Sequence, residues 1–168
     1  SKYYKLTKKK KILLISIKKD LKNFDIENLG AEFYARINYG KNSEYIINSD
    51  SVIGKHENFI GHFLHGLKLK SYKFNKYKTK KEKRIISISV SGNKNKRSSQ
   101  NQLKFKALEE GTFYARDLVS EPGNILHPDE YAKRLIQLRK LGLKVTIDNK
   151  QKLKKLKMNA LLDVDKGS

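Results

Sequence analysis

Two histidines that stand three residues apart are candidate ligands of a metal ion. His62 and His65 would share one face of a helix, where two imidazoles can hold part of a zinc site. A zinc site needs about four ligands, and no aspartate or glutamate stands at a helpful spacing beside this pair. A structural or surface role for both histidines is therefore the stronger expectation. The chain has no cysteine, which excludes disulfides and thiolate ligands and suits a reducing compartment.

A second chemical feature is the basic stretch from Lys68 to Arg84, in which three aromatic residues are interleaved. Cations can follow phosphates and rings can stack on bases, so the pattern is typical of a nucleic-acid surface. The alternative is a solvated helix end whose rings pack inward. The lysines of this candidate surface are Lys68, Lys70, Lys73, Lys76, Lys78, Lys80 and Lys81, and its rings are Tyr72, Phe74 and Tyr77.

The overall charge also points to anionic partners, with a formal net charge of +21 over 168 residues. The basic residues are 32 lysines and only 6 arginines, however, and readers of bases rely on the planar fork of arginine. A lysine excess beside many isoleucines and asparagines is also what an AT-rich genome produces, and we prefer that explanation. No apolar run approaches the ~20 residues of a membrane span, so no membrane partner is expected.

The elements that would position these residues alternate between helix and strand, which predicts an α/β fold. Apolar residues three and four apart predict helices, the first with Asp25 as its N-cap. Short apolar or alternating runs predict strands, of which residues 11–17 would be buried. The predicted helices are 25–37, 52–69, 103–119, 128–141 and 150–158; the predicted strands are 11–17, 44–50, 84–90, 143–147 and 160–164, with a polar loop at 92–102.

The longest predicted helix, 103–119, would span roughly 25 Å. Gly111 lies inside it and costs about 1 kcal/mol relative to alanine, which usually means that another backbone packs close. The predicted buried stripe consists of Phe105, Leu108, Thr112, Ala115 and Val119, joined by Leu118. Residues 1–100 carry 24 basic and 8 acidic side chains and residues 101–168 carry 14 and 9, so this helix would connect two units of different charge.

An elbow follows the long helix. The helix ends near Arg116 and Asp117, residues 121–124 (EPGN) predict a sharp turn, and His127-Pro128 opens a new helix. Proline fixes φ, while glycine and asparagine tolerate unusual φ, so the elbow would be rigid.

Three segments, in order and at matching spacing, resemble the leucyl aminopeptidase family. The elbow ARDLVSEPGNILHPDEYAKRL resembles the family's "ARDLVNEPANxLTPxxFA". The stretch GHFLHGLKLKSYKFNKYKTKKEK resembles "GLLLGSYRFDKYKTKKK", and KKLKMNALLDVDKGS resembles "EKLGMGALLAVGQGS". The resemblance covers most of residues 53–168, and both ends of the chain look cut.

The resemblance implies a metallopeptidase of two domains. Residues 1–100 would be a partial macro-like N-terminal domain, 101–121 the connecting helix, and 122–168 the first βα elements of the catalytic domain. Members of the family are cytoplasmic homohexamers that release N-terminal residues from peptides, preferably leucine, and some bacterial members also bind DNA. They use two divalent metal ions, manganese or zinc, to activate a water and polarise the scissile carbonyl.

The resemblance assigns no catalytic or metal-binding residue to this chain. The family's ligands lie in motifs resembling "VGKGxTFDSGG" and "NTDAEGR", which come after the point matched by Ser168, so the chain alone is expected to be inactive. Lys166 matches the earlier "GQGS" motif instead of the metal-binding lysine. Departures from the family pattern fall at Lys157, Asn159, Asp163, Asp165 and Lys166. Losing a glycine that needs positive φ would cost ~1–3 kcal/mol, and an aspartate in a buried strand would need a partner.

Overall fold

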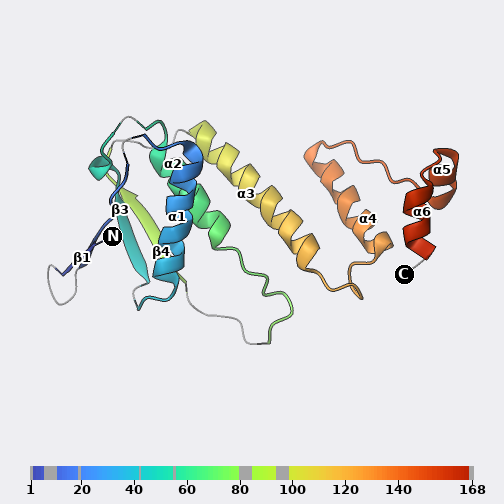
Figure 1. Ribbon diagram of the computed structural model, residues 1–168, viewed down its shortest axis with the longest axis horizontal. Helices are drawn as coiled ribbons and strands as arrows, with labels where there is room; N and C mark the ends of the chain where they lie inside the picture. Colours follow the sequence, from blue (N-terminus) through green and yellow to red (C-terminus); the bar gives the residue numbers. More distant parts are fainter. Residues whose placement is uncertain are drawn as a thin grey trace. The chain divides into compact units, whose positions relative to one another are not determined.

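The computed structural model describes residues 2–5, 11–18, 20–41, 43–54, 56–79, 85–93 and 99–166. The chain divides into two compact units, Ser1–Asp117 and Leu118–Ser168. Helices and strands are mixed along the chain (Figure 1), as the sequence predicts for an α/β fold.

The strands of the first unit form two small sheets. β1 (Lys2–Lys5) pairs antiparallel with β2 (Lys11–Leu14). β3 (Glu44–Asn48) pairs parallel with β4 (Ser87–Ser91), so that their carboxyl ends meet at one edge. The short 3₁₀ turn η1 (Ser49–Ser51) follows β3 at that edge.

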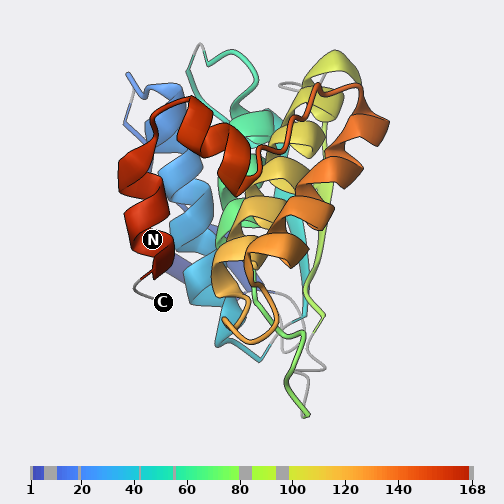
Figure 2. The ribbon, with the colours of Figure 1, turned by 90° about the vertical axis from the view of Figure 1, so that its right-hand side faces the viewer.

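Three helices pack in the first unit. α1 (Asn23–Asn38) and α2 (Phe59–Lys70) lie against each other, and α3 (Ser99–Ser120) begins in this unit. Hydrogen bonds tie α2 to α1 on one side and to α3 on the other, and the two ribbon views place α2 between them (Figures 1 and 2).

The core of the first unit is apolar and comes from α1 and α2. Partly buried residues from the strands and loops pack against it, among them Tyr45, Ile86 and Ile88. The predicted apolar face of the first helix is confirmed, because its members are buried or half-buried. The buried core consists of Ile26, Phe33, Ile37, Phe59, Ile60, Phe63 and Leu67.

Several predictions for the first unit are wrong in detail. The run 11–17 does form a strand over Lys11–Leu14, but Ile12, Leu14 and Ile15 are exposed because the β1–β2 hairpin turns only part of its surface to the core. Asp25 is not the N-cap of α1. It lies in the first turn, where its Oδ2 accepts a hydrogen bond from the backbone N–H of Lys22 at 2.9 Å.

The second helix begins later than the sequence predicts. α2 begins at Phe59 and not at residue 52, and Ile53 is 82% exposed. Gly54 has a φ of +117° and Asn58 a φ of 54°, so the left-handed backbone at both residues interrupts a helix that the apolar spacing alone would allow.

The long helix is confirmed, but its buried face is wrong. α3 begins at Ser99, inside the predicted polar loop 92–102. Phe105 is buried, whereas Leu108 is 49% and Val119 is 87% exposed. An added Cβ at Gly111 would meet nothing within 4 Å, so no described backbone packs against that glycine.

The second unit is helical throughout its described elements. α4 (Pro128–Ile136) starts with proline, and Asp129 and Glu130 lie in its first turn, as the sequence predicts. The 3₁₀ helix η2 (Gln137–Leu141) extends it to Gly142, whose φ of +83° ends the helix.

Of the last two helices, one was predicted and the other lies where a strand was predicted. α5 (Lys150–Lys155) was expected, but residues 160–164 belong to α6 (Asn159–Lys166), and residues 143–147 form no strand. Neither run has a partner strand among the described residues, and an unpaired strand leaves its backbone groups without bonds. Asp163 is therefore exposed on a helix instead of lying in a buried strand.

No helix among the described residues is long and apolar enough to cross a membrane.

Candidate functional site

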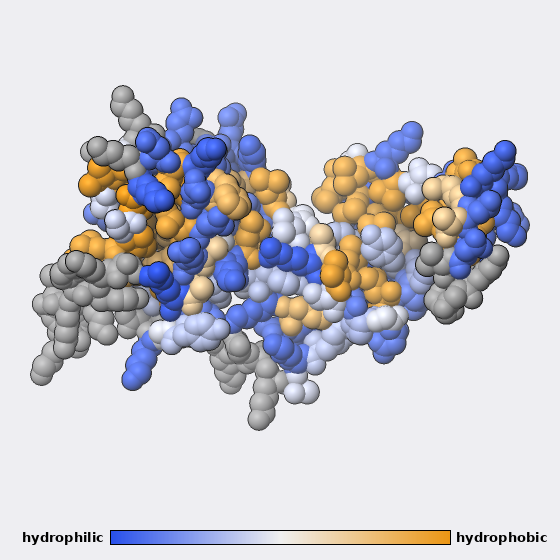
Figure 3. All heavy atoms as spheres, in the orientation of Figure 1, coloured by the Kyte–Doolittle hydropathy of each residue, from blue (hydrophilic) through white to orange (hydrophobic). Residues whose placement is uncertain are grey.

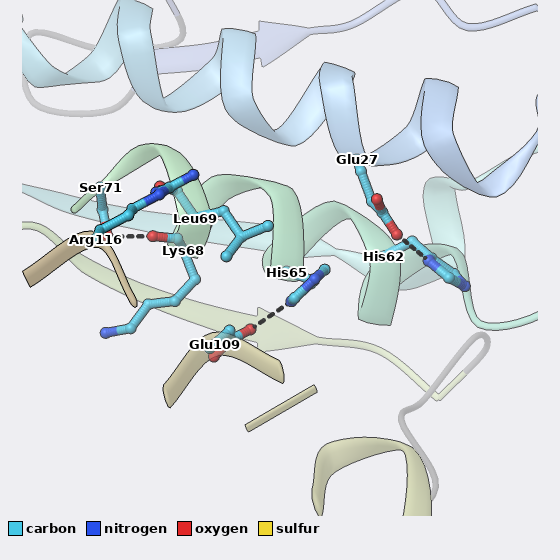
Figure 4. A network of polar contacts seen from close by, with 8 residues as sticks. All are labelled: Glu27, His62, His65, Lys68, Leu69, Ser71, Glu109 and Arg116. Atoms are coloured by element: carbon cyan, nitrogen blue, oxygen red, sulfur yellow. Dashed lines mark hydrogen bonds and ion pairs between the residues drawn. The ribbon is translucent and has the colours of Figure 1, made fainter. Parts of the chain in front are cut away.

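Each histidine of the α2 pair is bonded to a carboxylate from a different helix (Figure 4). The Nδ1 atom of His62 lies 2.8 Å from Oε1 of Glu27 on α1, and Nδ1 of His65 lies 3.0 Å from Oε1 of Glu109 on α3. A carboxylate only accepts, so each Nδ1 donates. The sequence could not reveal these partners, because they lie 35 and 44 residues away.

The ring of Phe105 fills the space between the two imidazoles. It makes an edge contact with His62 at 5.0 Å between ring centroids and a tilted contact with His65 at 4.8 Å. Phe105 and Glu109 are four residues apart, so one face of α3 supplies both the ring and the carboxylate. The histidine pair therefore docks the first half of α3 on α2 and serves structure, as the sequence favours.

A second set of contacts docks the later part of α3. Nη1 of Arg116 donates to the carbonyl oxygen of Leu69 at 2.6 Å, in the last turn of α2, where carbonyls lack helical partners (Figure 4). The same guanidinium lies 5.5 Å from the ring centroid of Tyr72, whose hydroxyl donates to Oδ1 of Asp117 at 2.7 Å. The Tyr72 ring also packs on Phe113 at 5.3 Å. We call Arg116, Tyr72 and Asp117 the arginine clasp.

The lysine segment, residues 68–79, separates into exposed cations and packed rings. Its lysines are exposed, whereas Tyr72 and Phe74 are half-buried and Phe74 contacts Tyr77 at 5.8 Å. Tyr72 and Phe74 therefore face the protein more than a stacked base would require, whereas Tyr77 is 50% exposed. The exposed lysines are Lys68, Lys70, Lys73, Lys76 and Lys78; Lys80 and Lys81 lie outside the described residues.

A groove of about 660 Å³ opens beside the end of α2. Lys68 and Lys73 line it together with the carboxylate residue Glu109 and with Asn75. The side-chain oxygen of Asn75 is buried and accepts no hydrogen bond from any described residue. Apolar residues, including Ile85, Ile86 and Ile88, form another part of the lining.

The elbow of the second unit is held by an arginine between two glutamates. Nη1 of Arg134 donates to Oε1 of Glu121 at 2.8 Å, and its Nε donates to Oε1 of Glu130 at 3.1 Å. The Glu121 side chain is 1% exposed. Hydrogen bonds to Glu121 and then Glu130 raise the pKa of Arg134 above its usual value. This pairing was not predicted from the sequence.

The turn itself is short and well bonded. The backbone N–H groups of Ile125 and Leu126 both donate to the carbonyl of Pro122, and Tyr131 donates to His127. A long helix, a tight turn and a new helix therefore follow one another as predicted.

Lys157 occupies the position where the family motif has a glycine, and its φ is 57°. Its N–H donates to the carbonyl of Lys154 and that of Met158 donates to Leu153, the pair of bonds that closes many helices with a left-handed residue. The strain expected from the loss of a glycine is therefore present.

Among the described residues, no group of three or more histidine, aspartate or glutamate side chains could hold a metal ion. His62 and His65 each bond a separate glutamate, so they do not converge on one point.

Comparison with known proteins points to one family. Residues 113–168 match the model described as "Cytosol aminopeptidase family, catalytic domain". A probable cytosol aminopeptidase of Rhodopseudomonas palustris (strain BisA53) is 33% identical over 96% of this chain, and one of Bradyrhizobium sp. (strain BTAi1) is 41% identical over 61% of it. The chain spans 34% of the length of the first relative and 21% of the second.

Solved structures support the fold. Two structures of the bottromycin maturation enzyme BotP, one of them in complex with Mn, align over 78% of this chain with TM-scores of 0.57 and 0.59. They share 19% and 18% sequence identity with it, and the chain covers 28% and 29% of their lengths.

Proposed function

The chain belongs to the cytosol aminopeptidase family, and from that premise we propose that it forms part of an enzyme that releases N-terminal amino acids from peptides. The carrying observation is the elbow at residues 118–136, which lies inside the family match and is built as the signature predicts. We propose that the whole enzyme is a cytoplasmic homohexamer that prefers leucine and uses manganese or zinc.

The role that we propose for this chain is positional. The paired metal ions of the family would activate water and polarise the scissile carbonyl. The described residues do not fit such ions, because none of their acidic and histidine side chains converge in threes. The histidine pair and the arginine clasp hold α3 against α2, and α3 leads directly into the elbow. We propose that the chain thereby positions the start of the catalytic domain but does not hydrolyse peptides alone.

A chimera tests the proposal. Residues 53–168 would replace the matching segment of the Rhodopseudomonas palustris relative, and hydrolysis of leucine-p-nitroanilide would be measured with added manganese. We expect the chimera to hydrolyse the substrate and the 168-residue chain to show no hydrolysis. A folded, hexameric chimera without activity would contradict the positional role. Hydrolysis by the isolated chain would show that the chemistry lies within it.

DNA binding by the lysine segment is the second candidate function. The observation in its favour is the row of exposed lysines from Lys68 to Lys78. Because Tyr72 packs on Phe113 and Phe74 packs on Tyr77, we propose that most contacts would go to phosphates, with the 50% exposed Tyr77 as a ring open to a base. Affinity for a duplex should then fall with salt, with a log–log slope of about −0.9 per phosphate contact. Absence of binding at low salt would rule this function out.

A further inference from the structure

We propose that the groove beside the end of α2 binds a small apolar amino acid. This site is separate from the elbow and makes no use of the metal chemistry of the family. It lies wholly within the first unit.

The lining of the groove sets three chemical requirements for a ligand. Lys68 and Lys73 are among its lining residues, and their positive charges favour an anionic group such as a carboxylate. The buried Asn75 oxygen lacks a hydrogen-bond donor among the described residues, and a buried acceptor without a donor is unfavourable. Because that oxygen is closed to solvent, the N–H group of a ligand would reach it once the Asn75 side chain rotates toward the groove. Glu109, also in the lining, bonds His65 through Oε1, and the negative charge of its carboxylate also favours a cationic amine.

The apolar part of the lining sets the third requirement. Ile85 is 81% exposed, while Ile86 and Ile88 are half-buried. An apolar side chain laid on these isoleucines would remove their surface from water. A carboxylate, an ammonium group and an apolar side chain on one small frame describe an α-amino acid such as leucine or isoleucine.

The size of the groove agrees with this class of ligand. At about 660 Å³ it falls within the range of ~300–1,000 Å³ that is common for small-molecule sites. Apolar amino acids are also the products of the proposed reaction, so a role as a product-sensing site rests on that proposed function. The binding of an amino acid in the groove does not rest on that function, because binding requires no catalysis.

Binding is tested on the full chain by titrating leucine while recording amide and methyl NMR shifts. We expect saturable shifts at the Asn75 side-chain amide and at the methyl groups of Ile85, Ile86 and Ile88. Leucinamide lacks the carboxylate and 4-methylpentanoate lacks the ammonium group, so each should bind about tenfold more weakly or worse. Equal binding of either analogue, shifts located elsewhere, or no saturation would overturn the proposal.

Matched double variants separate the groove from general charge. K68Q/K73Q should weaken leucine binding about tenfold or more, whereas K76Q/K78Q removes the same charge outside the groove lining and should leave it unchanged. An equal effect of the two pairs on leucine binding would overturn the proposal, since it would show that leucine responds to the general positive charge and not to the groove. The shift mapping on the unsubstituted chain gives the decisive result if K68Q/K73Q does not fold.

Discussion

Lys157 is the residue whose backbone conformation conflicts most clearly with its side chain. At a φ of 57° a glycine avoids the steric cost that a Cβ adds. Lys157→Gly should therefore stabilise the end of α5 by about 1 kcal/mol. The measurement is amide hydrogen exchange of residues 153–158. The same substitution at Lys154, inside the helix, should destabilise α5 by about 1 kcal/mol; two effects of the same sign would contradict this account.

Glu121 and Glu130 both bond Arg134 but differ in burial. The Glu121 side chain is 1% exposed and that of Glu130 is 34% exposed. A buried charge pair suffers more from loss of one partner than a surface i,i+4 pair does. Glu121→Gln should lower amide protection in α4 about tenfold, whereas Glu130→Gln should lower it less than about threefold. Equal losses would show that burial does not set the strength of this pairing.

At the scale of single residues, the sequence predicted those features that depend only on neighbouring residues along the chain. Pro128 at the start of α4 and the strained Lys157 are both local effects, and both were predicted. The roles of Glu27, Glu109 and Glu121 were missed. Each bonds a residue far away along the chain, and such a bond leaves no regular spacing in the sequence.

The crossing of α1 and α2 depends on two glycines. An added Cβ at Gly30 would collide with the carbonyl of Phe63, and one at Gly66 with the carbonyl of Glu27. Gly30→Ala and Gly66→Ala should each destabilise the first unit by about 1–3 kcal/mol, as measured by chemical denaturation.

Gly111 provides the matched control for this experiment. It lies in α3 with nothing within 4 Å of an added Cβ, so Gly111→Ala should stabilise the helix by about 1 kcal/mol. Destabilisation by Gly111→Ala would mean that another surface packs there.

The arginine clasp should contribute measurably to the docking of α3. Arg116→Met removes the bond to the Leu69 carbonyl and the contact with the Tyr72 ring, and should cost about 1.5–3 kcal/mol. Tyr72→Phe removes only an exposed hydrogen bond and should cost about 0.5–1.5 kcal/mol. In a double-mutant cycle the two effects should be non-additive, because the side chains touch. Strict additivity would contradict a shared clasp.

At the scale of elements, helices were predicted better than strands. The apolar spacing in residues 25–37 and 103–119 is local and was sufficient to identify α1 and α3. A strand depends on a partner elsewhere in the chain, so the apolar runs at 143–147 and 160–164 were misassigned. The buried face of α3 was wrong for a related reason. Polar residues, Glu109 and Arg116, dock it, and a search for apolar stripes overlooks them.

The two units differ in how much apolar surface they bury. The first has a core of seven buried apolar residues from α1 and α2. In the described part of the second, Leu162 is the one buried apolar side chain, and many apolar residues, such as Leu141 and Leu156, are exposed. Figure 3 shows apolar atoms, in orange, beside hydrophilic ones, in blue, over the part of the chain that holds α4 to α6.

The second unit, which buries less apolar surface, should have the lower local stability. In the full chain, amides of α4 to α6 should exchange at least about tenfold faster than those of α1 and α2. Hydrogen exchange read by mass spectrometry gives the comparison. Equal protection in both units would show that the second is stabilised by something other than its own burial.

The reciprocal glycines at the α1–α2 crossing also have a mechanical consequence. Each helix places a carbonyl against a glycine of the other, so a slide by one turn would set a side chain of the adjacent turn where only a hydrogen fits. The two helices should therefore move as a single body under load. A pulling experiment on the first unit should show one abrupt rupture of the pair and no gradual shear.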